Sequence, residues 1–156
     1  MQKIRTNMWF DDQAEEAIAF YLSVFGDGRV HHVLRNTESS PGGTGTVVAV
    51  EFELAGQQFV AINGGPYTTF NDAMSLEVPC DTQDEVDHYW NRLTEGGEEV
   101  QCGWLHDRYG VSWQIVPRRL HELLRDPDRE AADRVMKAML GMKKLDIRAL
   151  EDAYGK

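Results

Sequence analysis

Apolar and polar residues recur along the first 65 positions as a series of strand-like and helix-like segments. A strand is predicted over Ile4–Phe10, followed by a helix over Gln13–Phe25 in which apolar side chains return at the helical period. Alternation at every second position then predicts three more strands, over Val30–Arg35, Thr46–Leu54 and Gln58–Asn63. The first part of the chain therefore reads as one strand, one helix and three strands, in that order.

The same order returns after Gly64-Gly65-Pro66 interrupts regular structure. A predicted strand through Ala73–Cys80 leads to a helix that opens near Asp81-Thr82. Short strands are predicted beyond that helix, over Glu98–Gln101, Trp104–Asp107 and Val111–Val116. The second part of the chain thus repeats the pattern of the first.

An offset of 69 residues places the second predicted helix on the first. The two share an acidic start, a pair of aromatic residues and a glycine stop: Glu16 falls on Glu85, Phe20 on Tyr89, Tyr21 on Trp90 and Gly28 on Gly97. Duplication explains this joint coincidence better than chance does. We therefore predict an α+β fold of two tandem βαβββ modules, over residues 1–65 and 71–117.

Residues 118–156 are predicted to form a helical C-terminal extension. Helical segments are expected over Leu120–Leu124 and Arg129–Leu140, and from Asp146 toward Tyr154, and Asp126-Pro127-Asp128 is a start signal for the second of them. Such an extension has to cover an apolar surface. The two candidates are the exposed back of the sheet and a second copy of the chain.

Charge is distributed unevenly along the 156 residues, whose net charge is −10. Residues 1–117 carry 6 Lys and Arg against 18 Asp and Glu, a balance of −12, whereas residues 118–156 carry 10 against 8, a balance of +2. An acidic body repels nucleic acid and anionic membrane surfaces. We therefore expect neither as a partner.

The sequence also bears on location and on cysteine chemistry. Its apolar runs are all shorter than the roughly 20 residues of a membrane helix. The start Met-Gln-Lys-Ile-Arg-Thr lacks the apolar segment of a signal peptide, so a cytoplasmic protein is expected. Cys80 and Cys102 are 22 residues apart without a CxxC spacing, and we expect both to be free thiols.

Several separated motifs carry a resemblance to a known superfamily. They are Trp9-Phe10-Asp11, Ala14-Glu15-Glu16-Ala17, Phe20-Tyr21, Cys102-Gly-Trp-Leu with Asp107 and Tyr109-Gly-Val-Ser-Trp-Gln114, and Met139-Leu140 with Met142-Lys143-Lys144. Over about residues 3–117 the chain resembles the vicinal-oxygen-chelate superfamily of glyoxalase I, extradiol dioxygenases and bleomycin-resistance proteins. Within it, the motifs look like the PhnB-like branch, also labelled 3-demethylubiquinone-9 3-methyltransferase.

The resemblance implies two strongly curved sheets that form a cleft, in a homodimer. In enzymes of the superfamily, His, Glu or Gln side chains from equivalent strands of the two modules hold a divalent metal in that cleft. The positions that match here are Thr6 or Met8, Ala61 or Asn63, one of Ala73, Ser75 and Glu77, and Gln114. One carboxylate and neutral amides are too few donors for zinc, nickel or iron. No metal is therefore expected.

Other cofactors have no motif in this chain. Gly42-Gly43-Thr-Gly45 is followed by a strand, whereas a phosphate-binding loop leads into a helix. A glycine-rich strand-to-helix turn of the dinucleotide-binding type is also missing from the sequence, so no S-adenosylmethionine site is indicated. We expect no cofactor.

Residues predicted on inward strand positions are the candidates for ligand binding. Tryptophans there can stack on a flat ligand, and core packing is the alternative. Inward polar residues contact either a ligand or one another, and a histidine there is either a general base or an ordinary half-buried side chain. The candidates are Gln114, Trp104, Trp113, Asn63, Ser75, Glu77 and His106.

These observations favour a metal-independent small-molecule-binding protein with its ligand in the curved-sheet cleft. The alternative is an enzyme of the same superfamily, either a metal-assisted isomerase or lyase or a methyltransferase for a demethylated ubiquinone precursor. A third possibility is that side chains fill the cleft and the protein works through its dimer surface. The sequence does not identify the ligand.

Overall fold

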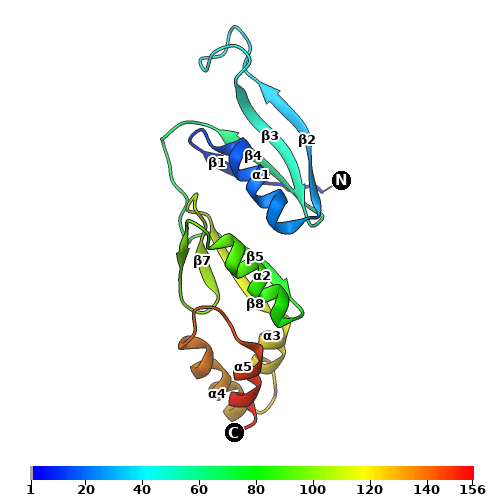
Figure 1. The fold of residues 1–156 in the computed structure, drawn as a ribbon, viewed down its shortest axis with the longest axis vertical. Coiled ribbons are helices and arrows are strands. Elements are labelled where there is room, and N and C mark those ends of the chain that lie inside the picture. The colour runs from blue at the N-terminus through cyan, green and yellow to red at the C-terminus, as the bar shows by residue number, and fades with distance from the viewer. Residues whose placement is uncertain (1) are drawn as a thin grey trace. The chain divides into compact units, whose positions relative to one another are not determined.

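Two four-stranded sheets, one in each half of the chain, form the framework of the protein (Figure 1). The structure is a computed structural model that describes residues 2–156. It divides into two units, Met1–Phe70 and Asn71–Lys156, so the helical extension belongs to unit 2. The described part of the chain holds no helix that is both long and apolar enough to cross a membrane.

Unit 1 contains a βαβββ module with a mixed sheet. Its elements are β1 (Thr6–Phe10), α1 (Ala14–Phe25), β2 (Gly28–Arg35), β3 (Val47–Leu54) and β4 (Gln57–Asn63). The strand order is β1-β4-β3-β2, with β1 parallel to β4 and the other neighbours antiparallel. The predicted elements are all present; their last residues are the predicted ones, and their first residues differ by one or two positions.

Helix α1 lies across one face of this sheet (Figure 1), which we call the covered face. The opposite face is called the open face. Tyr21 and Ile18 are buried between helix and sheet, whereas Phe20 and Phe25 are only half-buried. Gly26 ends the helix in the left-handed conformation (φ 67°), which glycine adopts without strain, and its N–H donates to Leu22 O.

Unit 2 repeats the module. Its elements are β5 (Leu76–Cys80), α2 (Gln83–Leu93), β6 (Glu98–Glu99), β7 (Trp104–His106) and β8 (Ser112–Pro117). The strand order β5-β8-β7-β6 and the parallel pairing of β5 with β8 match the topology of unit 1. Trp90 of α2 is buried at the position equivalent to Tyr21. The predicted α+β fold of two βαβββ modules is confirmed.

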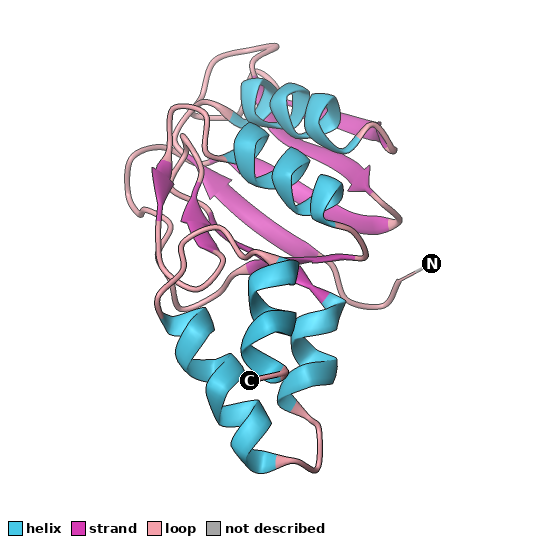
Figure 2. Cartoon of the chain, turned by 60° about the horizontal axis from the view of Figure 1, so that its bottom comes forward, coloured by secondary structure: helices cyan, strands magenta, loops and turns pink. Residues whose placement is uncertain are grey.

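The extension consists of three helices that lie side by side (Figure 2): α3 (Arg118–Leu124), α4 (Arg129–Leu140) and α5 (Ile147–Tyr154). They share a core with the end of β8, made of Val116, Leu120, Leu123, Val135, Leu145 and Leu150. Asp128 caps α4 and Asp146 caps α5, each by accepting a hydrogen bond from a backbone N–H in the first turn. The extension thus packs on the module from which it emerges.

Candidate functional site

The register of the second sheet determines which side chains share its open face. Glu77 pairs with Gln114, and Gln114 pairs with Trp104, so these three residues form one row across β5, β8 and β7. Their sequence neighbours Val78 and Ile115 are buried on the covered face, toward α2. Because side chains alternate along a strand, the row Glu77–Gln114–Trp104 lies on the open face.

Hydrogen bonds connect this row to neighbouring groups. The side-chain amide of Gln114 donates to Ser75 Oγ at 2.8 Å. The ring of His121, from α3, lies with Nε2 3.2 Å from Glu77 Oε1. Both polar residues of the row are therefore engaged within unit 2, and both are partly accessible.

His106 lies on the same face, between two carboxylates. Its Nε2 is 2.6 Å from Asp72 Oδ1 and its Nδ1 is 3.2 Å from Glu98 Oε2. Ser112, which pairs with His106 across β7 and β8, donates its hydroxyl to the same Asp72 oxygen at 2.5 Å. The hydrogen bond with Asp72 raises the pKa of His106 above its usual value, with a smaller contribution from Glu98. The hydrogen bonds from Ser112 and His106 lower the pKa of Asp72.

Five of the seven candidate residues are thus gathered on one face of one sheet. They are Ser75, Glu77, Trp104, His106 and Gln114. Two others, Trp113 and Asn63, lie elsewhere.

Trp113 is a core residue, and core packing is one of the two roles that the sequence left open for it. It lies on the covered face of unit 2 with 2% of its surface exposed. Its indole N–H donates to Asp107 Oδ2 at 2.9 Å. The other oxygen of the Asp107 carboxylate accepts the backbone N–H groups of Tyr109 (2.9 Å) and Val111 (3.0 Å). Asp107 and Trp113 therefore stabilise the β7–β8 turn, and their buried positions exclude contact with a ligand on the open face.

Asn63 also has a structural task, at the start of α1. Its side-chain oxygen accepts the backbone N–H of Ala14 at 2.9 Å, which satisfies one of the unpaired donors of the helix N-terminus. Its side-chain nitrogen donates to Glu15 Oε1 at 2.7 Å and to Val47 O at 3.2 Å. All the hydrogen-bonding atoms of this side chain are used within unit 1.

The face assigned to β1 and β4 from sequence requires a correction. Thr6, Met8, Ala61 and Asn63 were expected at inward positions, but they lie on the covered face together with the buried Phe10. Asn7 and Trp9 of β1 and Gln58, Val60 and Ile62 of β4 occupy the open face instead. These strands carry apolar residues on both faces, so their alternation did not indicate which face meets the helix.

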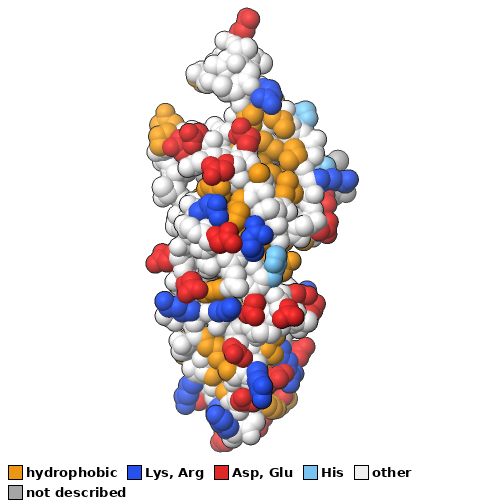
Figure 3. Space-filling view, viewed as in Figure 1, with side chains coloured by type: hydrophobic (Ala, Val, Ile, Leu, Met, Phe, Trp, Pro, Cys, Tyr) orange, Lys and Arg blue, Asp and Glu red, His pale blue; other side chains and the backbone are white. Residues whose placement is uncertain are grey.

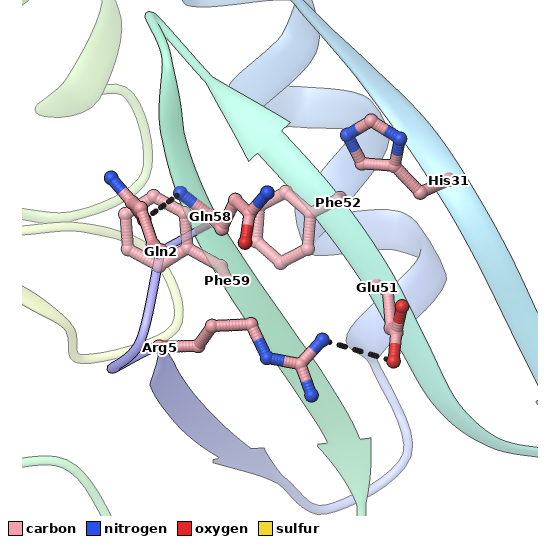
Figure 4. Close-up of a pocket in the computed structure, with 7 residues that line it drawn as sticks. All are labelled: Gln2, Arg5, His31, Glu51, Phe52, Gln58 and Phe59. Atoms are coloured by element: carbon pink, nitrogen blue, oxygen red, sulfur yellow. Dashed lines mark hydrogen bonds and ion pairs between the residues drawn. The ribbon is translucent and has the colours of Figure 1, made fainter.

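Unit 1 holds a pocket that the sequence did not predict, bordered by Glu51 and Gln58 of the open face and by Phe52 and Phe59 of the covered face. Its volume is about 490 Å³. It is lined by Gln2, Arg5, His31, Glu51, Phe52, Gln58 and Phe59 (Figure 4). Arg5 Nη1 and Glu51 Oε1 form an ion pair at 3.0 Å, and each side chain is less than half exposed. One feature of the sequence could have indicated this pocket: charged and apolar residues alternate along β3, which places Glu51 and Glu53 on the side opposite Phe52.

The donor set does not fit the divalent-metal site that the resemblance implies. Within residues 2–156, no group of three or more His, Cys, Asp or Glu side chains is placed to hold a metal ion. The central row of unit 2 offers Glu77 and Gln114, which are hydrogen-bonded to other side chains. The equivalent row of unit 1 consists of Asn7, Val60 and Glu51. We therefore derive no metal-dependent step.

Comparisons with known proteins agree with this architecture. The family model described as 3-demethylubiquinone-9 3-methyltransferase matches residues 2–116. The match ends before α3, so the tail motif from Met139 to Lys144 lies outside it. No curated protein matches the chain.

Solved structures show the same fold. A structure described as a putative 3-demethylubiquinone-9 3-methyltransferase, PhnB protein, from Bacillus cereus is 38% identical, with a TM-score of 0.68 over 74% of this chain and 99% of that one. Protein PA1353 from Pseudomonas aeruginosa is 19% identical (TM-score 0.64; 75% and 98% covered). The fosfomycin resistance protein FosX from Listeria monocytogenes is 15% identical (TM-score 0.55; 78% and 97% covered). At this identity, the similarity supports the fold and no shared activity. The chain belongs to the PhnB-like 3-demethylubiquinone-9 3-methyltransferase family, and its fold is the one expected from the resemblance to glyoxalase and bleomycin-resistance proteins.

Proposed function

We propose that this chain is a metal-independent small-molecule-binding protein whose ligand lies on the open faces of its sheets. The pocket of unit 1 carries this proposal. Its volume of about 490 Å³ lies within the range of small-molecule sites in proteins. Arg5, Glu51 and Gln58 surround it with a cation, an anion and an amide. Such a lining can orient a small polar molecule through several hydrogen bonds.

The first test of this function is a search for a molecule that copurifies with the protein. The chain is purified without an affinity tag and its extract is analysed by mass spectrometry, with elemental analysis of the same sample. We expect a small molecule that is retained in the wild type and lost from Arg5→Ala. Arg29→Ala is the matched control, because Arg29 lies on β2 and does not line the pocket.

Two outcomes would count against the proposal. About one divalent metal ion per chain, with ligand retention abolished by a chelator, would overturn metal independence. Equal retention of the molecule by Arg5→Ala and Arg29→Ala would overturn the assignment of the pocket.

An enzyme is the second candidate, and the environment of His106 favours it. An imidazole held by Asp72 and still partly accessible on an open face is a suitable proton-transfer group.

The family description suggests a specific reaction, which is methyl transfer to a demethylated ubiquinone precursor. The strand-to-helix turns of this chain contain Asp11, Asp12 and Asp81 and no glycine, so they do not fit the phosphate- or nucleotide-binding pattern of common cofactor sites. Turnover of a demethylated quinone with a labelled methyl donor, lost in His106→Gln, would favour this candidate.

We also propose that the chain forms a homodimer, as its resemblance to the superfamily implied. Exposed apolar side chains of β2 support this proposal: Val30, Val33 and Leu34 lie on the edge strand of the first sheet. In the view of Figure 1, the molecular surface carries patches of apolar side chains between charged ones (Figure 3). Native mass spectrometry should give twice the chain mass of 17.7 kDa. A single-chain mass at micromolar concentration would contradict the proposal.

A further inference from the structure

Helix α3 lies outside the family match yet contacts the open face of unit 2. The family model ends at residue 116, and α3 begins at Arg118, directly after β8. Pro117, the last residue of β8, has the extended conformation (φ −65°, ψ 134°) that leads into the first turn. Leu120 and Leu123 bury the inner side of α3 in the core of the extension. The position of α3 beside the sheet is therefore determined by packing.

The far end of the extension is attached to unit 2 as well. The backbone N–H groups of Cys102 and Gly103 donate to Met142 O and Lys143 O, both at 2.8 Å. The side-chain amide of Gln83, at the start of α2, donates to Leu145 O at 3.0 Å and accepts from Ile147 N at 2.8 Å. These bonds join the extension to the module at a second place. They make the extension a fixed part of unit 2.

The residue that α3 brings to the open face is His121. Its Nε2 lies 3.2 Å from Glu77 Oε1, and the two side chains are 47% and 43% exposed. Glu77 supplies the carboxylate of the row that also contains Gln114 and Trp104. Trp104 is partly exposed, and its ring can stack on a planar group. A ligand on this row would therefore meet a ring, an amide and a carboxylate that His121 already engages.

We propose that α3 is a wall of the ligand-binding face and that His121 selects the ligand by engaging Glu77. This inference rests on the proposed function, because it names the class of ligand that the open face of unit 2 accepts. A cationic ligand such as an amine or amidine would have to displace His121 from the carboxylate. A neutral ring can stack on Trp104 without that displacement. The face therefore favours neutral ring-bearing molecules over cationic ones.

Three probes of nearly equal shape test this selectivity. Benzoate, benzamide and benzamidine share one ring and differ in charge. Their binding is followed by fluorine NMR of the full chain labelled with 5-fluorotryptophan, in which the Trp104 resonance is assigned with a Trp104→Phe variant. We expect His121→Ala to raise the affinity for benzamidine relative to benzamide about two- to fivefold, as expected for one partly exposed ion pair. The affinity for benzoate should not increase.

Two control variants separate this effect from a general disturbance of α3. Arg119→Ala removes a charged side chain of the same helix, which pairs with Glu122 and Glu151, and should leave the ratio unchanged. Glu77→Gln combined with His121→Ala should cancel the gain for benzamidine, because the freed carboxylate is then absent.

The possible failures are distinguishable. Equal probe ratios in the wild type and His121→Ala would overturn the selective role of His121 while leaving the ligand face in place. Binding of none of the three probes to any variant would overturn the ligand face of unit 2 and this inference with it. The pocket of unit 1 would still be judged by the Arg5→Ala experiment.

Discussion

The two βαβββ units share their topology but differ in the parts that do not face a helix. In unit 1, β2 and β3 are eight residues long, whereas β6 and β7 of unit 2 have two and three residues. The covered faces are alike: Ala61 and Ile115 are buried at equivalent register positions, as are Phe59 and Trp113. The positions that pack against the helix are therefore apolar in both units.

The open faces have diverged at every position of the central row. By register, Asn7 of unit 1 corresponds to Glu77, Val60 to Gln114, and Glu51 to Trp104. Each face consequently has its own chemistry, with an ion-paired pocket in unit 1 and an amide, carboxylate and ring in unit 2. The comparison shows that the covered faces maintain the fold, and it supports the proposal that the ligand lies on the open faces.

The sharpest test of this comparison is the covered face itself. Trp113→Ala is expected to lower the free energy of unfolding by about 3–5 kcal/mol, because a buried ring is removed and the Asp107 carboxylate loses a donor. Phe59→Ala, at the equivalent position of unit 1, should cost a similar amount. Trp104→Ala, on the open face, should cost about 1 kcal/mol or less. Urea unfolding followed by circular dichroism measures all three. Equal losses from Trp113→Ala and Trp104→Ala would contradict the assignment of faces.

The equivalent helices are capped in different ways, which gives a second test. Thr82 caps α2 locally by accepting the N–H of Glu85, whose carboxylate accepts the N–H of Asp81. Helix α1 instead relies on Asn63, from a strand distant in sequence. Asn63→Ala is expected to cost about 1–2 kcal/mol and Thr82→Ala about 1 kcal/mol of unfolding free energy.

Hydrogen exchange separates the local from the global part of these losses. Asn63→Ala should speed amide exchange in the first turn of α1, at Ala14, and leave the first turn of α2 unchanged. Thr82→Ala should do the reverse. A ligand-binding role for Asn63 without a structural one would instead leave exchange at Ala14 as in the wild type.

The sequence determined the elements well where local signals agreed. Helix α4 was predicted over Arg129–Leu140 and has these bounds, because Asp128 provides a cap and the apolar stripe has the helical period. Strand faces were predicted less well. In β5 and β8 the polar residues Glu77 and Gln114 indicated the open face, whereas β1 and β4 have Trp9 and Val60 there.

The contacts that complete the candidate sites join residues far apart in the chain. His106 meets Asp72 across 34 positions, and His121 meets Glu77 across 44. Such pairs depend on strand register and helix placement, which local patterns do not specify. The pocket of unit 1 likewise brings Arg5 to Glu51. Residue type indicated only His106 and Glu77 as candidates, and the fold alone revealed Asp72, His121 and the Arg5–Glu51 pair.

The smallest expected effect concerns His106, which distinguishes the open face of unit 2 from that of unit 1, where Glu53 occupies the equivalent position. The hydrogen bond with Asp72 raises the pKa of His106 above its ordinary value of 6.5, so the folded state holds this proton more tightly than the unfolded state. The resulting stabilisation is complete below pH 6.5 and is lost as the pH rises through the raised pKa.

NMR titration of the His106 ring should give a midpoint above 6.5, and Asp72→Asn should return it toward that value. His106→Gln should flatten the stability profile in this pH window alone. A midpoint at or below 6.5 would show that Asp72 does not hold His106 in solution, and the case for a proton-transfer site on this face would fall with it.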